Sequence, residues 1–399
     1  MKTLLFVDDE PRVLQGLQRQ LRPMRMEWDM NFVESGQRAL EFMATHPVDI
    51  IVSDMMMPLM DGSQLLTEVL KRHPHTVRLV LSGHAEREAV LRLVGPAHQY
   101  LSKPCDADEL RRAIVRAFAL RDLLGNERLK QLTARIKHLP TLPALQNRLT
   151  EELHKDSPSM ECVGEIISRD IGMTAKILQL VNSAFFGLAQ PITNPTEAAV
   201  YLGLNTLRSL VLSMEIFSQF DQKLCPSFSL EVLAGHSWTT SMMSRSIAQL
   251  EQQELKVIDQ CFLAGLLHDV GQLVLAFGLH EEYAGVLTRA QNEGLPIWQV
   301  EQECFGATHA DVGAYLLALW GLPNPIIEAV ALHHQPAHST NLLFAPVTAV
   351  HVADVLSHQL AVTCTEEPAP ELQTAYLKRL GLDHRFELWQ ESCTQLTNA

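Results

Sequence analysis

Apolar and polar positions alternate in two ways over the first 122 residues. Short continuous apolar runs have the length and composition of strands buried on both faces of a parallel sheet. These runs occupy residues 3–7, 31–33, 50–53, 79–81 and 100–101. Between them lie segments with helical spacing, such as 11–21, whose apolar residues form one stripe and whose Pro11 suits the first helical turn. This order predicts an α/β doubly wound domain.

Helical spacing dominates from residue 138 to the end of the chain, and strand signals disappear. The clearest helix start is at Asn194, a capping residue, with Pro195 at the first helical position and Glu197 at the third. Further along, Gly203 predicts a break between two buried helices. We therefore expect this block to be all-α.

These patterns divide the chain into four parts. Residues 123–137 are polar with a thin apolar stripe, which is typical of a connector helix. We expect the α/β domain at 1–122, the connector at 123–137, the helical domain at 138–340 and, at 341–399, a helical extension that completes it. The heptad pattern of the connector is imperfect, so formation of a homodimer through the connector or the first domain stays an open alternative.

Composition narrows the class of protein. At 399 residues and 47% hydrophobic content, the chain has room for two or three packed domains. A net charge of −14 disfavours nucleic-acid binding, which needs clustered lysine and arginine. The seven cysteines form no CxxC pair, which indicates reduced thiols. No uncharged apolar run approaches the roughly 18 residues of a membrane helix, so we expect a cytoplasmic protein with neither nucleic acid nor membrane as partner.

Polar side chains stand where four of the predicted strands end. They are Asp8, Asp9, Asp54, Ser82 and Lys103. The carboxyl ends of parallel strands share one crevice, where gathered carboxylates repel one another unless a hard cation such as Mg²⁺ lies between them. Asp54 can then attack a phosphoryl donor, while Ser82 and Lys103 bind the phosphoryl oxygens. A single Asp after a strand is more often a cap or turn residue, but the ordered set favours phosphoryl transfer.

The same residues resemble the receiver domain of two-component response regulators over residues 1–122. Further matches are the loop Met57-Pro58-Leu59-Met60-Asp61-Gly62, the pair Lys103-Pro104, and Tyr100. The resemblance implies a flavodoxin-like fold in which Asp54 takes a phosphoryl group from a histidine kinase.

The resemblance to receivers also implies the roles of the other residues at these strand ends. A Mg²⁺ ion would lie at the Asp8-Asp9 pair, held by Asp9, Asp54 and the backbone carbonyl of Met56. On phosphorylation Ser82 and Tyr100 would move inward and alter the surface of the domain, as a switch.

The helical block carries a spread of imidazoles and carboxylates. They are His236, His268, Asp269, His309, His333, His334 and Asp354. Imidazole with carboxylate is a ligand set for Fe, Mn, Zn or Ni, and such a site would activate water against phosphate esters. The chain has 17 histidines, however, and a lone histidine is more often a surface or hydrogen-bonded core residue. Both interpretations stay open at this point.

The order of these residues resembles the HD superfamily of metal-dependent phosphohydrolases, and most closely its HDOD branch (the HD-related output domain), over about 138–340. Further matching segments are 139–143, 171–178, 181–187, 313–317 and 320–323. The resemblance implies metal ligands at His236, His268, Asp269 and Asp354, with His309, His333 and His334 available for a second ion. It also implies a signalling output module rather than an established enzyme.

Two departures separate the chain from the branch of HD proteins, called HD-GYP, that cleaves cyclic-di-GMP. Gln272 stands where that branch carries lysine, which removes a cation that would bind phosphate. Residues 335–338 replace its Gly-Tyr-Pro loop. We therefore do not expect hydrolysis of cyclic-di-GMP.

Two functions remain from the sequence. The favoured one is a cytoplasmic response regulator that is phosphorylated on Asp54 by a histidine kinase and relays the signal through an HDOD output domain that binds another protein. The alternative is a phosphorylation-gated, metal-dependent HD-type phosphohydrolase acting on a nucleotide or cyclic nucleotide. Whether the output is an enzyme stays open.

Overall fold

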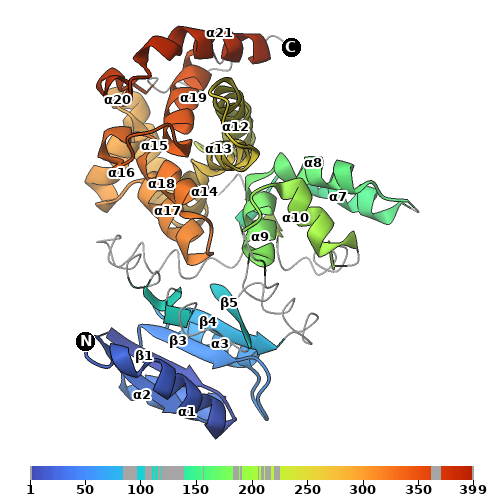
Figure 1. Cartoon of the computed structure of the whole chain (residues 1–399), viewed down its shortest axis with the longest axis vertical. Coiled ribbons are helices and arrows are strands. Elements are labelled where there is room, and N and C mark those ends of the chain that lie inside the picture. The colour runs from blue at the N-terminus through green and yellow to red at the C-terminus, as the bar shows by residue number, and fades with distance from the viewer. Residues whose placement is uncertain are drawn as a thin grey trace. The chain divides into compact units, whose positions relative to one another are not determined.

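A computed structural model of the chain is shown in Figure 1. Besides a few isolated positions, it describes residues 2–83, 97–103, 139–155, 157–182, 191–204, 217–219, 225–360 and 370–397. The chain divides into two compact units, with the main boundary between Lys137 and His138. The predicted connector at 123–137 lies outside the described residues, and the exact domain bounds stay a prediction.

The first unit contains a five-stranded parallel sheet in the order β2-β1-β3-β4-β5. Its strands are β1 (Lys2–Val7), β2 (Trp28–Val33), β3 (Ile50–Asp54), β4 (Val77–Gly83) and β5 (Gln99–Lys103). Every residue of β3 is buried, which explains its continuous apolar run. The predicted α/β doubly wound domain is confirmed, and each predicted strand falls within an observed one.

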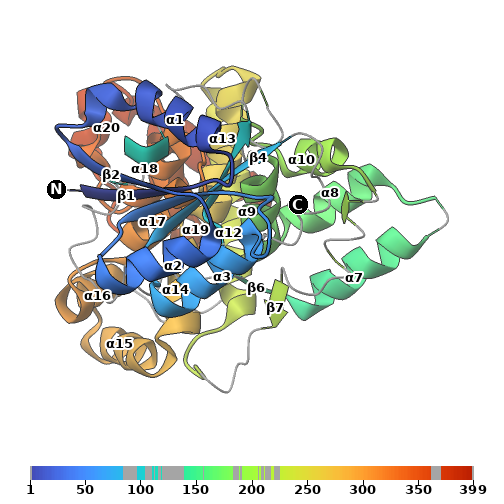
Figure 2. The same cartoon turned by 90° about the horizontal axis from the view of Figure 1, so that it is seen from below.

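Helices lie on both sides of this sheet. Those whose bounds the structure describes are α1 (Pro11–Gln20), α2 (Gly36–Thr45) and α3 (Gly62–Arg72), with the 3-10 turn η1 (Arg22–Met24) after α1. Figure 2 shows α1 on one side of the sheet and α2 and α3 on the other. Helix α1 begins at Pro11, as predicted, and buries Leu14 and Leu17 of the predicted stripe.

The register of the strands brings their polar ends to one level. Val7, the last residue of β1, pairs with Ser53 of β3. The residues that follow them in sequence, Asp8 and Asp54, therefore lie side by side. Strand β4 separates β3 from β5, which ends at Lys103. The carboxyl edge of the sheet therefore carries the predicted site.

The described residues from 139 onward are mostly helical. Its helices are α7 (Pro143–His154), α8 (Met160–Ser168), α9 (Ile171–Val181), α10 (Pro195–Leu202), α12 (Leu230–Leu250), α13 (Leu255–Leu267), α14 (Val270–Gly278), α15 (His280–Glu293), α16 (Ile297–Phe305), α17 (His309–Leu319), α18 (Asn324–Leu332), α19 (Pro346–Leu360), α20 (Thr374–Leu380) and α21 (Phe386–Thr397), with the 3-10 turns η3 (Pro336–His338) and η4 (Asp383–Arg385). A mostly helical second domain is what the sequence predicted.

The expectation that this block contains helices alone is wrong at one point. Strands β6 (Leu139–Thr141) and β7 (Phe217–Gln219) form a two-stranded parallel sheet. Strands of three residues are too short to show a period of two, so the sequence carried no signal for them.

The predicted helix start at Asn194 is confirmed. Its side-chain oxygen accepts hydrogen bonds from the backbone N–H groups of Thr196 at 2.9 Å and Glu197 at 3.3 Å, and Pro195 is the first residue of α10. The helix ends before Gly203, whose φ of 77° lies in the region that favours glycine. Most of the helix expected after this break lies outside the described residues.

Helices α12, α13 and α19 pack on one another in the core of the helical part, and α20 and α21 close over them. Trp389 of α21 is fully buried and donates its indole N–H to Glu251 at 2.9 Å. The segment Leu255–Gly278 is apolar and long enough to cross a membrane, but 83% of its most apolar window is buried within the protein, as in a core helix. The cysteines at 162, 225, 261, 304 and 393 are free.

Candidate functional site

The strand-end site of the first unit is formed by Asp8, Asp54 and Lys103. Asp8 and Asp54 are buried, with 1% and 6% of their surface exposed. The Lys103 ammonium donates to Asp8 Oδ2 at 2.6 Å and is ion-paired with Asp54 Oδ1. One cation therefore joins two carboxylates that would otherwise repel each other.

Backbone groups orient both carboxylates. Asp54 Oδ2 accepts a hydrogen bond from the N–H of Met56 at 3.1 Å, and Asp8 Oδ1 accepts one from the N–H of Glu10 at 2.9 Å. Burial raises the pKa of Asp54 above its ordinary value, although Lys103 opposes this rise. Burial alone would lower the pKa of Lys103, but its hydrogen bonds to the two carboxylates raise it, so the ammonium stays charged.

The predicted site also includes Asp9, Met56, Ser82 and Tyr100. Asp9 follows Asp8 and is partly exposed, and Met56 lies just past β3. Ser82 belongs to β4 and Tyr100 to β5, where Tyr100 pairs with Val80. The side chains of Ser82 and Tyr100 are outside the described part of the structure, so their role as a switch stays a prediction.

The loop after β3 requires glycine where it enters α3. A Cβ atom on Gly62 would lie 2.3 Å from the backbone oxygen of Asp54 and 3.0 Å from Met55 Cα. Neither backbone atom can move without shifting Asp54. We expect Gly62→Ala to destabilise the first unit by about 1–3 kcal/mol through overpacking, and to lower the protection of the β3 amides against hydrogen exchange.

A matched control for Gly62→Ala is Gly16→Ala in α1. A Cβ on Gly16 meets nothing within 4 Å, and the residue lies inside a helix. Alanine there is expected to stabilise by about 0.5–1 kcal/mol, since glycine loses more backbone entropy on folding. Equal exchange protection of β3 in the two variants would contradict the steric argument.

The helical part gathers all seven predicted imidazoles and carboxylates into one buried group, here called the His/Asp cluster. It consists of His236 of α12, His268 at the end of α13, Asp269 at the start of α14, His309 at the start of α17, His333 and His334 just past α18, and Asp354 of α19. Helix ends supply five of the seven residues, which lets side chains from separate helices converge without kinking any helix.

The main chain sets the proton position of two imidazoles in the His/Asp cluster. His268 Nδ1 lies 2.8 Å from the carbonyl oxygen of Gly265, and His333 Nδ1 lies 2.8 Å from that of Val330. A carbonyl oxygen only accepts hydrogen bonds, so each Nδ1 carries a proton. In the neutral ring, Nε2 then presents a bare lone pair to the cluster.

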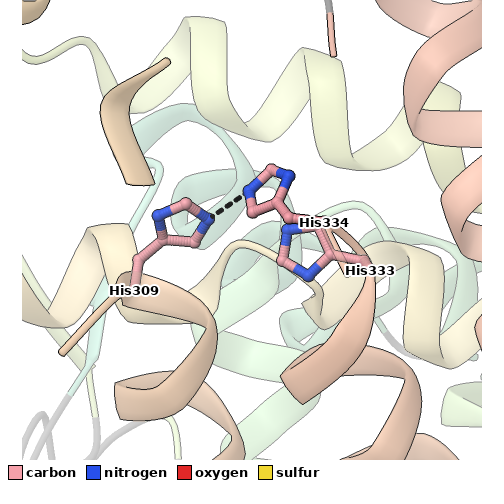
Figure 3. Close-up of side chains that lie close together, drawn as sticks. All are labelled: His309, His333 and His334. Carbon is pink, nitrogen blue, oxygen red and sulfur yellow. Dashed lines mark hydrogen bonds between the residues drawn. The ribbon is translucent and has the colours of Figure 1, made fainter. Parts of the chain in front are cut away.

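Several buried polar atoms of the cluster make no hydrogen bond of good geometry, although imidazole nitrogens lie 3.1 Å from Asp269 Oδ1 and from Asp354 Oδ1. The atoms are Asp269 Oδ1, His333 Nε2, His334 Nδ1 and Asp354 Oδ1. Pairs of ring nitrogens also face each other, with His236 Nε2 3.1 Å from His268 Nε2 and His309 Nε2 3.0 Å from His334 Nε2 (Figure 3). Leaving a buried acceptor unpaired costs roughly 1–3 kcal/mol. A bound cation removes this cost, so the geometry fits a metal ion.

The protonation states suit a divalent metal as well. Burial lowers the pKa of His333 to about 3 and the pKa of His334 well below its ordinary value, so both rings are neutral. Burial alone would raise the pKa of Asp269, but the imidazoles of His268 and His309 hold it well below its usual range. Neighbouring carboxylates instead raise the pKa of His268 and His309 above the ordinary value, although burial opposes the rise. A metal ion would displace the protons of these two rings, which would leave neutral imidazoles and ionised carboxylates, the donor set of Fe, Mn, Zn and Ni sites.

The candidate ligand atoms of the cluster form three overlapping groups, His236-His268-Asp354, His309-His333-His334 and His268-Asp269-His333, and the atoms of each group lie within 4.8 Å of one another. We call the two groups that share no residue metal positions A and B. Position A is formed by His236, His268 and Asp354, and position B by His309, His333 and His334. Asp269 lies between the positions, since its Oδ2 is 3.3 Å from His268 Nε2 and its Oδ1 is 3.1 Å from His309 Nε2. A carboxylate placed this way can bridge two ions.

Two residues of the site escaped the sequence analysis. His358 of α19 has its Nδ1 3.2 Å from Asp354 Oδ1 and its ring centroid 4.5 Å from that of His236. Its spacing of four from Asp354 on a helix was the signal that could have found it. Glu301 of α16 is fully buried and contacts His309, but a single glutamate in a helical segment carries no such signal.

A cavity of about 220 Å³ opens onto the cluster. Its polar lining includes His236, Asp269, His309, His334, Asp354, His358 and Gln272, and its apolar wall includes Phe228, Leu233, Leu287, Ile297 and Trp298. The ring of Trp298 stacks on His334 with centroids 5.8 Å apart. Gln272, which stands where the cyclic-di-GMP-cleaving branch carries lysine, therefore faces the cavity. A small molecule entering the cavity would reach the cluster directly.

Comparison with known proteins agrees with both resemblances. A response regulator receiver domain model matches residues 4–115, and an HDOD domain model matches residues 139–336. In structure, the chain is similar to the MmoQ response regulator of Methylococcus capsulatus, with 25% identity, a TM-score of 0.50, and coverage of 63% of this chain and 98% of that one.

Several curated relatives match parts of the chain. The hydrogenase transcriptional regulatory protein HoxA of Cupriavidus necator is 32% identical over 153 residues, which cover 38% of this chain and 30% of HoxA. A protein of Treponema pallidum is 25% identical over 209 residues, covering 51% of this chain and 39% of the relative. The matches thus span less than half the length of these relatives. From the two domain matches and the likeness to MmoQ, the chain belongs to the response regulators that carry an N-terminal receiver domain followed by an HDOD domain.

Proposed function

We propose that Asp54 is the phosphoacceptor of this response regulator and takes its phosphoryl group from a cognate histidine kinase. The observation that carries the proposal is the Lys103 ammonium held between the carboxylates of Asp8 and Asp54 at the carboxyl edge of the sheet. Phosphoryl transfer needs mainly positioning and charge neutralisation, and both are present in this arrangement.

Different residues of the site have different roles in the phosphoryl transfer. The Met56 N–H orients Asp54, while Lys103 supplies a positive charge beside the attacking oxygen. Asp9, Asp54 and the backbone carbonyl of Met56 would hold Mg²⁺, which neutralises charge on the transferring group. We propose Ser82 and Tyr100 as the switch, on the basis of their places in β4 and β5.

For the output, we propose that the HDOD domain binds divalent metal at the His/Asp cluster and hydrolyses a phosphate ester. The sequence favoured an output that binds a protein partner, on the basis of the complete receiver site, the HDOD-like segments, Gln272 and the missing Gly-Tyr-Pro loop. The cavity that opens onto a complete ligand set adds an observation for hydrolysis. A divalent metal in the cluster would polarise a phosphoryl oxygen and lower the pKa of a water molecule.

Each part of the cluster has a task in this proposal. The buried carboxylates of Asp269 and Asp354 would offset the charge of divalent ions, and the imidazoles of the cluster would supply the remaining ligands. The wall formed by Phe228, Ile297 and Trp298 would keep bulk water away from the substrate. The free cysteines and the buried core segment Leu255–Gly278 support the further proposal that the protein works in the cytoplasm.

The proposed hydrolysis can be tested by an activity assay with a generic phosphodiester substrate. We expect the full-length protein, loaded with Mn²⁺, to hydrolyse bis(p-nitrophenyl) phosphate, as measured by release of p-nitrophenolate. Asp354→Ala should lose this turnover, because Asp354 is both a ligand of position A and part of the cavity lining. Asp383→Ala, at an exposed carboxylate of η4, should keep it. A protein that binds metal without any turnover would leave partner binding as the output.

A further inference from the structure

We propose that Glu301 is a positioning residue that tunes metal position B through His309, and that Tyr283 holds Glu301 in place. The inference rests on the metal binding proposed above. It concerns residues that lie outside the ligand set and that touch neither a metal ion nor a substrate. The two positions would then differ in metal affinity for a reason built into the fold.

Both carboxylate oxygens of Glu301 accept hydrogen bonds. Its Oε2 accepts two hydrogen bonds from one residue, from the backbone N–H and from the ring Nδ1–H of His309, both at 2.7 Å. Its Oε1 accepts a hydrogen bond from the Tyr283 hydroxyl at 3.0 Å. Both Glu301 and Tyr283 are fully buried. A carboxylate held by three donors cannot turn away from His309, so Nε2 of that ring must face the cluster.

The charge balance of the two positions explains what Glu301 adds. Position A includes the carboxylate of Asp354, whereas the ligand group of position B has three imidazoles and no carboxylate. Two carboxylates lie beside position B, with Asp269 Oδ1 3.1 Å from His309 Nε2 and Asp354 Oδ2 4.0 Å from His334 Nδ1. A divalent ion at position B therefore lacks a carboxylate of its own. Glu301 supplies a negative charge behind His309. Its carboxylate contacts Nδ1 of that ring, while Nε2 of the same ring faces the metal position. A carboxylate that accepts from the far nitrogen of a ligand histidine also makes the near nitrogen a stronger donor.

Three other ligand imidazoles, those of His236, His268 and His333, do not have this arrangement. His268 and His333 donate their Nδ1–H to neutral main-chain carbonyls. His236 has its Nδ1 3.2 Å from the hydroxyl of Ser357, which is also neutral. Among these ligand rings, His309 is the one placed against a carboxylate through Nδ1, so the effect of Glu301 should be confined to position B.

A purely structural role for Glu301 is the competing explanation. His309 is the first residue of α17, and its N–H is among the helix donors that have no partner within the helix. Glu301 caps that N–H. A cap would stabilise α17 without favouring one metal position over the other, and a test must separate the two effects.

The experiment is a Co²⁺ titration of the metal-free, full-length protein, followed by visible absorption and calorimetry. The wild-type protein should show two binding phases, and His334→Ala should identify the phase of position B by losing it. Glu301→Gln keeps the size of the side chain and removes its charge. We expect it to weaken the position B phase about 10–100-fold and to leave the position A phase unchanged. Tyr283→Phe should weaken the same phase by a smaller factor.

Glu328→Gln is the matched control. Glu328 lies on α18 and bonds to Ser339 and Asn341, away from the cluster. This variant should bind Co²⁺ as the wild-type protein does. If Glu301→Gln weakens both phases equally, or neither, Glu301 is only a cap and the inference is overturned. If the wild-type protein binds no Co²⁺, the proposed metal-dependent output fails and the inference fails with it.

Discussion

Replacing Asp54 with alanine is expected to abolish phosphorylation of the protein by a small phosphodonor such as acetyl phosphate in the presence of Mg²⁺. The substitution removes the attacking oxygen, and Asp8, the other buried carboxylate of the site, is held by Lys103 and by the backbone at Glu10. Intact-protein mass spectrometry measures the result directly, as loss of the added phosphoryl group. Downstream effects of phosphorylation on the HDOD domain should vanish in the same variant.

Asp29→Ala is the control for this experiment. Asp29 is an exposed carboxylate of β2 in the same domain, and its removal should leave phosphoryl incorporation unchanged. Folding of the Asp54→Ala variant is expected to persist, since Lys103 retains its bond to Asp8. Undiminished incorporation in Asp54→Ala would show that the phosphoacceptor is elsewhere.

Replacing Asp269 with alanine is expected to empty both metal positions. The two oxygens of Asp269 face position A and position B separately, so one substitution removes a ligand and a negative charge from each. Elemental analysis of tag-free protein should fall from about two transition-metal ions per chain, as in two-metal sites, to none. Loss of one ion that is present at 100 times its Kd costs about 2.7 kcal/mol, so loss of two costs about 5.4 kcal/mol, and the Tm of the helical domain should fall by roughly 10–20 °C.

Two further measurements make the Asp269 result interpretable. Wild-type protein from which a chelator has removed the metal should have the same lowered Tm as Asp269→Ala, because both lack the ions. Asp269→Asn, which keeps the shape of the side chain, should also lose metal if the charge is what matters. Wild-type levels of metal in Asp269→Ala would rule out the bridging position of this carboxylate. An equal Tm for metal-loaded and chelated wild-type protein would show that the cluster is not a metal site.

The sequence carried strong information about the receiver domain because its signals are local. Each strand is a continuous apolar run, and each polar group of the site stands beside such a run in the chain. In a parallel sheet, the position of a residue at the end of a strand already implies its place at the carboxyl edge. Asp8, Asp54 and Lys103 could therefore be assigned to one site before their contacts were known.

The His/Asp cluster shows the limit of that argument. The sequence named its members by their order along the chain, but nothing local relates His236 to Asp354, which lie on different helices far apart in sequence. Glu301 was missed because its partner, His309, is on another helix, and a buried carboxylate in a helical pattern looks like any solvent-facing one. The short sheet of β6 and β7 was missed because three residues are too few for a periodic signal.

The sequence by itself determined the fold class, the succession of the two domains, the edge of the sheet where the acidic site lies and the residues available as metal ligands. Each of these follows from patterns within a few residues or from the geometry of parallel strands. Only the tertiary structure decided that the seven cluster residues meet, that Asp269 lies between two positions, and that Glu301 orients His309. These features depend on how whole helices pack. The hydrophobic effect that drives packing is non-directional, so a sequence pattern shows which face of a helix is buried but not which other helix covers it.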